Sequence, residues 1–142
     1  MEDLRRQVVE AARPLDDDQL NRAVPGLRNT VAVLLRHLAG AERYMIGEVV
    51  GGRPAGRNRD AEFGLDRLSK DALLEEIERV AALSREVFAG LHPADLAGEV
   101  EIRRSHGTFK ETRATALLHA AQHLAYHLGQ IRILVALLRA TS

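Results

Sequence analysis

The chain has 142 residues, of which 46% are hydrophobic and 28% charged, as is typical of one soluble globular domain. Lysine plus arginine and aspartate plus glutamate both number 20, so the zero net charge gives no reason to expect nucleic acid or an anionic membrane as a partner. Cysteine is absent, which excludes disulfides, thiolate metal ligands and a cysteine nucleophile. There is no signal-like or membrane-spanning apolar run, so we expect a cytoplasmic protein.

The first half of the chain contains two segments with helical apolar periodicity. The first is expected over residues 2–12 and ends before Pro14, with a further short turn over residues 16–20. The second begins at an N-cap, Asn29 or Thr30, and stops at the two glycines 51–52. A polar loop rich in arginine and glycine follows over residues 53–66, and its length indicates that it is either mobile or functional.

The second half contains two further helical segments. Ser69 caps the third helix, which ends near Gly90. Residues 91–107 alternate apolar and charged side chains around Val100, which predicts a short extended segment or a small hairpin. Thr108 and Glu111 have the spacing of a capping box and predict the start of a fourth helix that runs to about residue 139.

This pattern predicts an all-α fold. Amphipathic helices with mostly short connections favour an antiparallel four-helix bundle, with a long loop between the second and third helices and a short extended segment before the fourth. No internal repeat or low-complexity tract occurs, so residues 1–142 are expected to form a single domain.

Three histidines, His119, His123 and His127, fall within nine residues of the predicted fourth helix. Positions four apart differ by about 40° around a helix, so all three rings leave one side. An i,i+4 pair of imidazoles is the spacing with which a helix offers two ligands to one metal ion. On a helical wheel His127 lies roughly 25°, His123 roughly 65° and His119 roughly 105° from the centre of the apolar stripe. This ranking favours His123 and His127 as the ligand pair.

Ordinary helix histidines, hydrogen-bonded or solvated, are the alternative, and for any single one of them that alternative is favoured. For the pair a metal site is favoured instead, because two buried imidazoles without a shared ligand leave polar atoms unpaired at about 1–3 kcal/mol each. A third ligand must come from another helix, and His37 in the second helix is the natural candidate. The wheel places His37 roughly 105° from that helix's apolar stripe, so an edge histidine near the surface is the alternative there.

Other side chains could also contribute to such a site. Glu42 and Glu48 are alternative donors on the second helix, and Glu42 is also a candidate general base. His92 and His106 fall in predicted loops, where solvent exposure is the better expectation.

Two segments of the sequence match a known pattern. One is Leu34-Leu35-Arg36-His37-Leu38, and the other covers residues 119–131 with the form His-x3-His-x2-Tyr-His-x-Gly-Gln. Residues 107–112, Gly-Thr-Phe-Lys-Glu-Thr, give a looser third match. With this set of segments the sequence resembles the DinB-like superfamily, metal-binding four-helix bundles that include thiol-dependent S-transferases.

The resemblance implies a divalent metal ion, zinc or nickel, held by His37, His123 and His127 with an open coordination position. It places His119, Gln130 and Tyr126 around these ligands, in positions that support them, and it implies a homodimer. Tyr126 is also a possible general base. These assignments agree with the wheel ranking on the fourth helix and supply the third ligand.

An open three-histidine site is the arrangement of catalytic zinc, which lowers the pKa of bound water toward ~7 or deprotonates a bound thiol. Because the chain has no cysteine, a thiolate must arrive on a small-molecule substrate. The resemblance therefore implies an S-transferase that activates a low-molecular-weight thiol. Arg53, Arg57 and Arg59 could bind carboxylates of such a thiol, although a solvated loop is the more frequent role. A hydrolase that uses metal-bound hydroxide and a non-catalytic metal-binding or dimeric scaffold are the alternatives.

Overall fold

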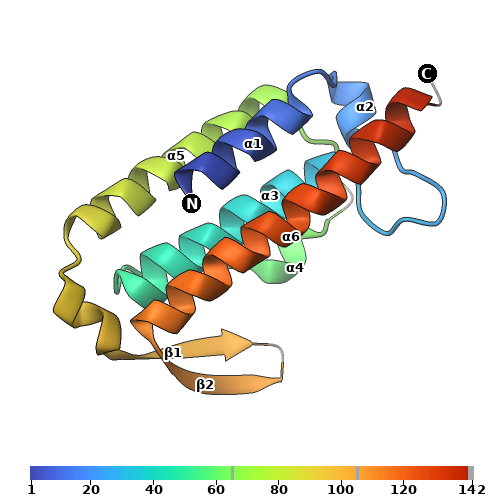
Figure 1. Ribbon diagram of the computed structural model, residues 1–142. Helices are drawn as coiled ribbons and strands as arrows, with labels where there is room; N and C mark the ends of the chain where they lie inside the picture. The colour runs from blue at the N-terminus through green and yellow to red at the C-terminus, as the bar shows by residue number, and fades with distance from the viewer. Residues whose placement is uncertain (65, 105, 141–142) are drawn as a thin grey trace.

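The computed structural model describes residues 1–64, 66–104 and 106–140, and this part of the chain is mostly helical with a small two-stranded antiparallel sheet (Figure 1). The elements are α1 (Glu2–Ala12), α2 (Asp17–Asn21), α3 (Val31–Glu42), η1 (Arg43–Val50), α4 (Arg59–Glu62), α5 (Lys70–Ala89), η2 (Pro93–Ala97), β1 (Glu99–Arg104), β2 (Gly107–Thr112) and α6 (Arg113–Ala140). Within the described residues no helix is long and apolar enough to cross a membrane.

Side-chain caps define where several helices begin. The Thr30 hydroxyl accepts a hydrogen bond from the Val33 amide at 3.2 Å, which starts α3 at the second of the two predicted caps. The hydroxyl of Ser69 caps α5 as predicted, and the helix ends at Gly90. The short turn predicted after Pro14 is α2, which is capped by Asp16.

The second predicted helix consists of two helix types in one continuous segment. The α-helix α3 continues into η1, an eight-residue π-helix that ends at Gly51. The amide of Gly51 donates to the carbonyl of Ile46 at 2.9 Å, the five-residue spacing of a π-helix. Such segments are rare and occur frequently at functional sites. Here the wider turns follow directly after the part of α3 that carries His37.

The long helices pack side by side, with the β-hairpin at the end where α6 begins (Figure 1). Helix α6 packs against α1, α3 and η1, and α3 also packs against α5. One apolar cluster joins α1, α2, α3, α5 and α6 and includes Leu20, Leu35, Ile131 and Leu138. A second cluster lies under the hairpin and includes Ile46, Ile102 and Ala116. The histidines of interest lie on α3 and α6, which the first cluster packs together.

The short extended segment or small hairpin predicted before the last helix is present: residues 99–104 and 107–112 pair, with Val100 opposite Glu111 and Arg103 opposite Thr108. The fold is therefore mostly helical rather than strictly all-α. The predicted start of the last helix needs correction. Thr108 and Glu111 therefore form no capping box, and α6 begins only at Arg113. The buried side chains of β1 favour strand pairing here over an earlier helix start.

The loop expected over residues 53–66 is not wholly irregular. Asn58 accepts a hydrogen bond from the Ala61 amide at 3.1 Å and starts the one-turn helix α4. This turn packs against α3. The position of α4 brings its last residue, Glu62, next to His37.

Candidate metal centre

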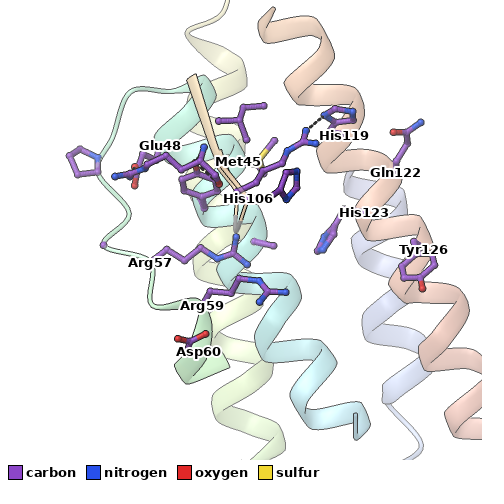
Figure 2. A pocket seen from close by; sticks show the side chains of 17 residues that line it. Met45, Glu48, Arg57, Arg59, Asp60, His106, His119, Gln122, His123 and Tyr126 are labelled. Carbon is purple, nitrogen blue, oxygen red and sulfur yellow. Dashed lines mark hydrogen bonds and ion pairs between the residues drawn. The ribbon is translucent and has the colours of Figure 1, made fainter. Parts of the chain in front are cut away.

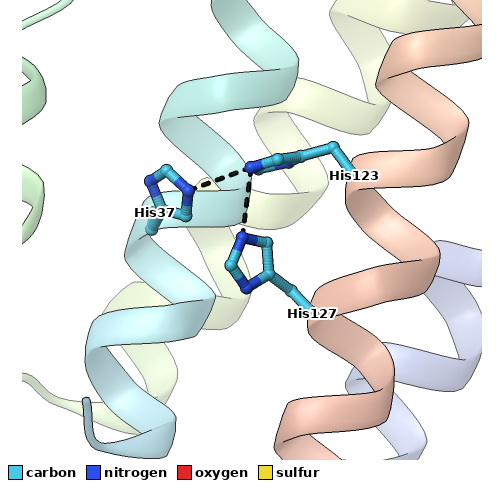
Figure 3. A group of neighbouring side chains, drawn as sticks. All are labelled: His37, His123 and His127. Carbon is cyan, nitrogen blue, oxygen red and sulfur yellow. Dashed lines mark hydrogen bonds between the residues drawn. The ribbon is translucent and has the colours of Figure 1, made fainter. Parts of the chain in front are cut away.

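Three imidazoles from two helices converge on one point (Figure 3). His37 comes from α3, and His123 and His127 come from consecutive turns of α6. The Nε2 atom of His123 lies 3.0 Å from Nε2 of His37 and 3.1 Å from Nε2 of His127. His37 is buried, with 4% of its surface exposed, so it is not the edge histidine that the helical wheel left open. His123 and His127 are partly buried.

The Nδ1 atom of His37 faces a carboxylate. It lies 2.8 Å from Oε2 of Glu62, and both side chains are buried. Because the ionised carboxylate can only accept, Nδ1 of His37 carries the proton. The Nε2 atom of a neutral His37 then presents a lone pair to the other two histidines.

The Nδ1 atom of His127 is fixed in the same way by an amide. It lies 2.6 Å from Oε1 of Gln130, whose Nε2 donates to the Tyr126 hydroxyl at 3.1 Å. With its nitrogen donating to tyrosine, Gln130 offers its oxygen as an acceptor, so Nδ1 of His127 carries the proton. Nε2 of His127 therefore also presents a lone pair to His123.

With these two tautomers, the three Nε2 atoms of the cluster share at most one proton, that of His123. His123 can donate at most one proton from Nε2, yet its Nε2 atom faces lone pairs on both His37 and His127. At least one of the two short N···N contacts then joins two acceptors. A cation between the nitrogens accepts all three lone pairs at once, which is why histidine ligands hold their other ring nitrogen in a hydrogen bond to an acceptor.

The spacing of the nitrogens fits a single small ion. Ligand distances of about 2.0–2.1 Å place the nitrogens of a tetrahedral zinc site about 3.3 Å apart, and slightly closer at smaller ligand angles. The observed separations of 3.0 and 3.1 Å fall near this value. The ligand atoms of all three residues lie within 4.8 Å of one another. The three residues thus fit one divalent ion without rearrangement of the helices.

The ionisation of the cluster suits ligation. Burial, followed by the neighbouring imidazoles of His127 and His37, lowers the pKa of His123 from 6.5 to about 3. Burial also lowers the pKa of His127. The two rings are therefore neutral at pH 7, the form in which imidazole binds a metal ion.

Glu62 lies in a recess of α3 that a glycine creates. A Cβ atom added to Gly40, one turn after His37, would lie within 2.7 Å of the Glu62 carboxyl carbon. Arg57 holds the same carboxylate from the other side, with Nε 2.6 Å from Oε1 and Nη2 2.8 Å from Oε2. Burial raises the pKa of Glu62, but hydrogen bonds from Arg57 and His37 outweigh it, so the pKa lies below its ordinary value.

A cavity of about 1120 Å³ opens beside the cluster (Figure 2). Its walls come from η1, the arginine-rich loop, the hairpin and α6. His123 and Tyr126 lie in its lining, so the three-histidine cluster borders the cavity on the side of α6. A small molecule in this space would reach the cluster without any movement of the helices.

The two carboxylates considered as alternative metal ligands on the second helix have other partners. Glu42 lies in a buried ion pair with Arg5, and Glu48 accepts a hydrogen bond from the Ala55 amide at 2.8 Å and pairs with Arg103. His92 and His106 are exposed, as the sequence predicts.

The loop arginines have different environments. Arg53 pairs with Glu86 at 2.6 Å, away from the cavity lining, and Arg57 holds Glu62. The guanidinium of Arg59 stacks over Phe63 at 5.0 Å and lines the cavity. His119 also lines the cavity, and its Nδ1 contacts Glu111 and Arg104.

Glu62 and Gly40 were not identified from the sequence. Glu62 lies in a polar stretch without period, and only the packing of α4 on α3 places it beside His37. The glycine at position 40 interrupts an apolar helix face, which is the weak signal available that another group approaches α3 there.

A helical fold with three converging imidazoles beside a cavity fits a metal-binding helical protein. The family model described as DinB superfamily matches residues 1–131, and the chain belongs to this superfamily. The fold is similar to that of a crystal structure described as the conserved protein of locus from Enterococcus faecalis, with a TM-score of 0.75 and 14% identity over 98% of this chain and 92% of that one. No curated protein matches the chain.

Proposed function

We propose that the protein binds one divalent metal ion through Nε2 of His37, His123 and His127. The observation that carries this proposal is the pair of short Nε2 contacts at 3.0 and 3.1 Å, with acceptors behind His37 and His127. Neutral nitrogen donors suit zinc or nickel, whereas calcium and magnesium prefer oxygen ligands. Zinc or nickel is therefore the proposed ion.

The chain's own residues prepare the site in three ways. Glu62 and Gln130 fix two imidazole tautomers, burial keeps His123 and His127 neutral, and the cavity gives a small molecule access to the cluster. An open three-histidine site supplies a Lewis acid that lowers the pKa of a bound thiol or water. A cavity beside the ligands favours an enzyme over a scaffold, whose metal site would be closed.

We propose further that the bound molecule is a low-molecular-weight thiol and that the reaction is S-transfer to an electrophile. The chain has no cysteine, so sulfur chemistry at this site requires a thiol from solution. Arg59 lines the cavity, where its guanidinium is positioned to bind a carboxylate of such a thiol. A hydrolase would act on water at the same position and would need no thiol.

We propose a homodimer in which the outer face of α6 forms the interface. Residues 114–131 contain no lysine, arginine, aspartate or glutamate, although one side of this stretch faces solvent. Leu118 and Tyr126 are 57% and 65% exposed on this stretch, and Ile133, two residues beyond it, is 59% exposed. Ile133→Glu should convert a dimer to a monomer in sedimentation velocity, whereas a monomeric wild-type chain would refute the interface.

The enzyme proposal is tested by thiol titration of the cobalt-substituted protein. A thiol that binds at the metal produces a sulfur-to-cobalt charge-transfer band, and an S-transferase should then consume an added electrophile. Cobalt binding without a thiol band, together with turnover of esters or amides, would support the hydrolase instead. Cobalt binding with neither would leave a metal-binding scaffold.

A further inference from the structure

A pair of polar side chains lies in the wall of the large cavity, one turn of α6 before His123 (Figure 2). His119 comes from α6 and Arg104 from β1, so the hairpin places a guanidinium against the imidazole. Nη2 of Arg104 donates to Nδ1 of His119 at 3.0 Å and to Oε1 of Glu111 at 3.0 Å. The guanidinium also stacks over the ring of Phe109 at 5.5 Å, and these contacts hold it in the cavity wall.

The guanidinium determines the tautomer of His119. A guanidinium can only donate, so Nδ1 of His119 accepts its hydrogen bond and the proton of the neutral ring is on Nε2. Oε2 of Glu111 also lies 3.0 Å from Nδ1, but it has no hydrogen-bond partner, so the carboxylate does not set the tautomer. Among the described residues none forms a hydrogen bond with Nε2 of His119, or with Nε and Nη1 of Arg104. Arg104 and His119, the donor pair, therefore have N–H groups available to a molecule in the cavity.

The positive charge of the donor pair is already balanced. Arg104 forms an ion pair with Glu111 at 3.0 Å. Arg59, in another part of the cavity wall, forms no ion pair or hydrogen bond with a described residue and only stacks over Phe63. A carboxylate is therefore expected at Arg59, whereas the donor pair suits a neutral oxygen that gains negative charge during a reaction.

The position of the donor pair limits which oxygen it can bind. Four residues of a helix span about 6 Å, so His119 lies about that distance along α6 from the ligand His123. This separation suits an oxygen several bonds away from the carbon that a sulfur at the cluster attacks, rather than an oxygen on that carbon. The cavity also offers apolar surface to a carbon skeleton, from Ala41, Met45 and Ile102.

We propose that Arg104 and His119 bind the carbonyl oxygen of the electrophile, which is a carbonyl compound conjugated with a carbon–carbon double bond; this inference rests on the proposed function. The sulfur of the thiol bonds to the far carbon of the double bond, the π bond breaks, and the electron pair moves through the conjugated system to the oxygen. The donor pair stabilises this charge with its N–H groups, as an oxyanion hole does. The proton of the thiol leaves to solvent and a solvent proton bonds to the carbon next to the carbonyl, so the reaction is an addition without oxidation or reduction.

The tautomer can be measured without any metal or substrate. In metal-free protein labelled with ¹⁵N-histidine, two-bond ¹H–¹⁵N spectra at pH 8 should show His119 with a protonated Nε2 and a bare Nδ1. Arg104→Met leaves Glu111 as the only charged group against the ring and should move the proton toward Nδ1. Arg103→Met, which alters the neighbouring exposed arginine of β1, should keep the wild-type tautomer. A wild-type His119 with its proton on Nδ1 would overturn the donor pair.

Two electrophiles of similar size separate stabilisation of the oxygen from a general effect on the site. In acrylamide the electron pair moves to the amide oxygen when sulfur attacks, whereas in iodoacetamide, which carries the same amide, it leaves with iodide. With the cobalt-substituted protein and 2-mercaptoethanol, Arg104→Met and His119→Phe should slow the reaction of acrylamide about 100-fold. The reaction of iodoacetamide should remain near the wild-type rate in both variants.

The two proposals fail in different ways. An equal loss of rate with both electrophiles, or no loss with either, would refute the donor pair and leave the proposed function intact. A wild-type protein that consumes neither electrophile would refute the proposed S-transfer, and the tautomer of His119 would still decide whether the donor pair is arranged as described.

Discussion

Two clusters of polar side chains include residues of α3, and they differ in whether their contacts join hydrogen-bond donors to acceptors. In one, Glu42 lies between Arg5, whose Nε is 3.3 Å from Oε2, and Ser84, whose hydroxyl donates to Oε1 at 2.7 Å. All three residues are at least 93% buried, and both carboxylate oxygens of Glu42 accept hydrogen bonds. In the other, Nε2 of His123 faces Nε2 of both His37 and His127, so at least one of the two contacts joins two acceptors. The first cluster is complete in the chain itself, and a bound cation would complete the second.

This difference indicates that the first cluster stabilises the fold and that the second is a candidate binding site. A closed ion pair in the interior links α1, α3 and α5 and has no opening to solvent for a ligand. A cluster of convergent acceptors beside a cavity provides little for folding, because its contacts are not mutually favourable without an ion. Substitutions in one cluster should therefore leave the property that depends on the other unchanged.

The largest expected effect is the loss of metal binding in the open cluster. His123→Ala or His127→Ala removes one of three ligands, and both variants should lose stoichiometric metal while circular dichroism remains close to that of the wild type. His92→Ala is the control and should keep its metal. Unchanged metal content in both ligand variants would show that the site lies elsewhere.

Disruption of the closed cluster should affect stability instead. Arg5→Ala leaves the Glu42 carboxylate buried without its cation, and the free energy of unfolding should fall by about 3–5 kcal/mol. Urea denaturation measures this loss, and the folded fraction should still bind one metal ion. Arg6→Ala removes an exposed arginine from the same helix and should leave the denaturation midpoint nearly unchanged. Equal midpoints for the two variants would refute the role given to Arg5.

A smaller change is expected when the support of His37 is weakened. Glu62→Gln keeps the shape of the side chain but removes the charge behind Nδ1, and metal affinity should fall about 10–100-fold. Competition with a chromogenic chelator gives the dissociation constant. Asp60→Asn, in the same turn of α4, is the control and should have little effect. An unchanged constant in Glu62→Gln would mean that the carboxylate is not needed to orient His37.

The smallest expected effect is a change with pH in the free energy of unfolding of the metal-free chain. The pKa of His123 is about 3 in the folded protein against an ordinary value of 6.5, so between these values the unfolded chain binds a proton that the folded chain does not. Stability is therefore complete above pH 6.5 and falls as the pH is lowered, by about 1–2 kcal/mol between pH 7 and pH 5. Urea denaturation in a chelator should show this slope, and His123→Ala should flatten it. Equal slopes in the two proteins would contradict the low pKa.

The sequence predicted the parts of the site that depend on local periodicity. The i,i+4 spacing of His123 and His127 was sufficient to pair them, because no glycine or proline occurs between Thr108 and Gly129 and a continuous helix is therefore expected there. The caps Thr30 and Ser69 were likewise visible, since capping depends on a few neighbouring residues.

The rest depends on contacts between distant segments. The helical wheel placed His37 at an edge, but α4 covers that edge of α3, and ten of the twelve α3 residues are buried. Glu62 reaches His37 from a loop whose sequence has no period, so no local rule identifies it. Glu111 matched a capping box and instead lies in β2, because the hairpin forms a register in which it faces Val100.

The central claim is tested most directly by metal analysis of the chain purified without an affinity tag. Plasma mass spectrometry should find about one zinc or nickel ion per chain, either as isolated or after incubation with the metal and gel filtration, and none in His123→Ala. A wild-type chain that contains no metal and takes up none would contradict the account, since the three histidines would then be a feature of helix packing alone.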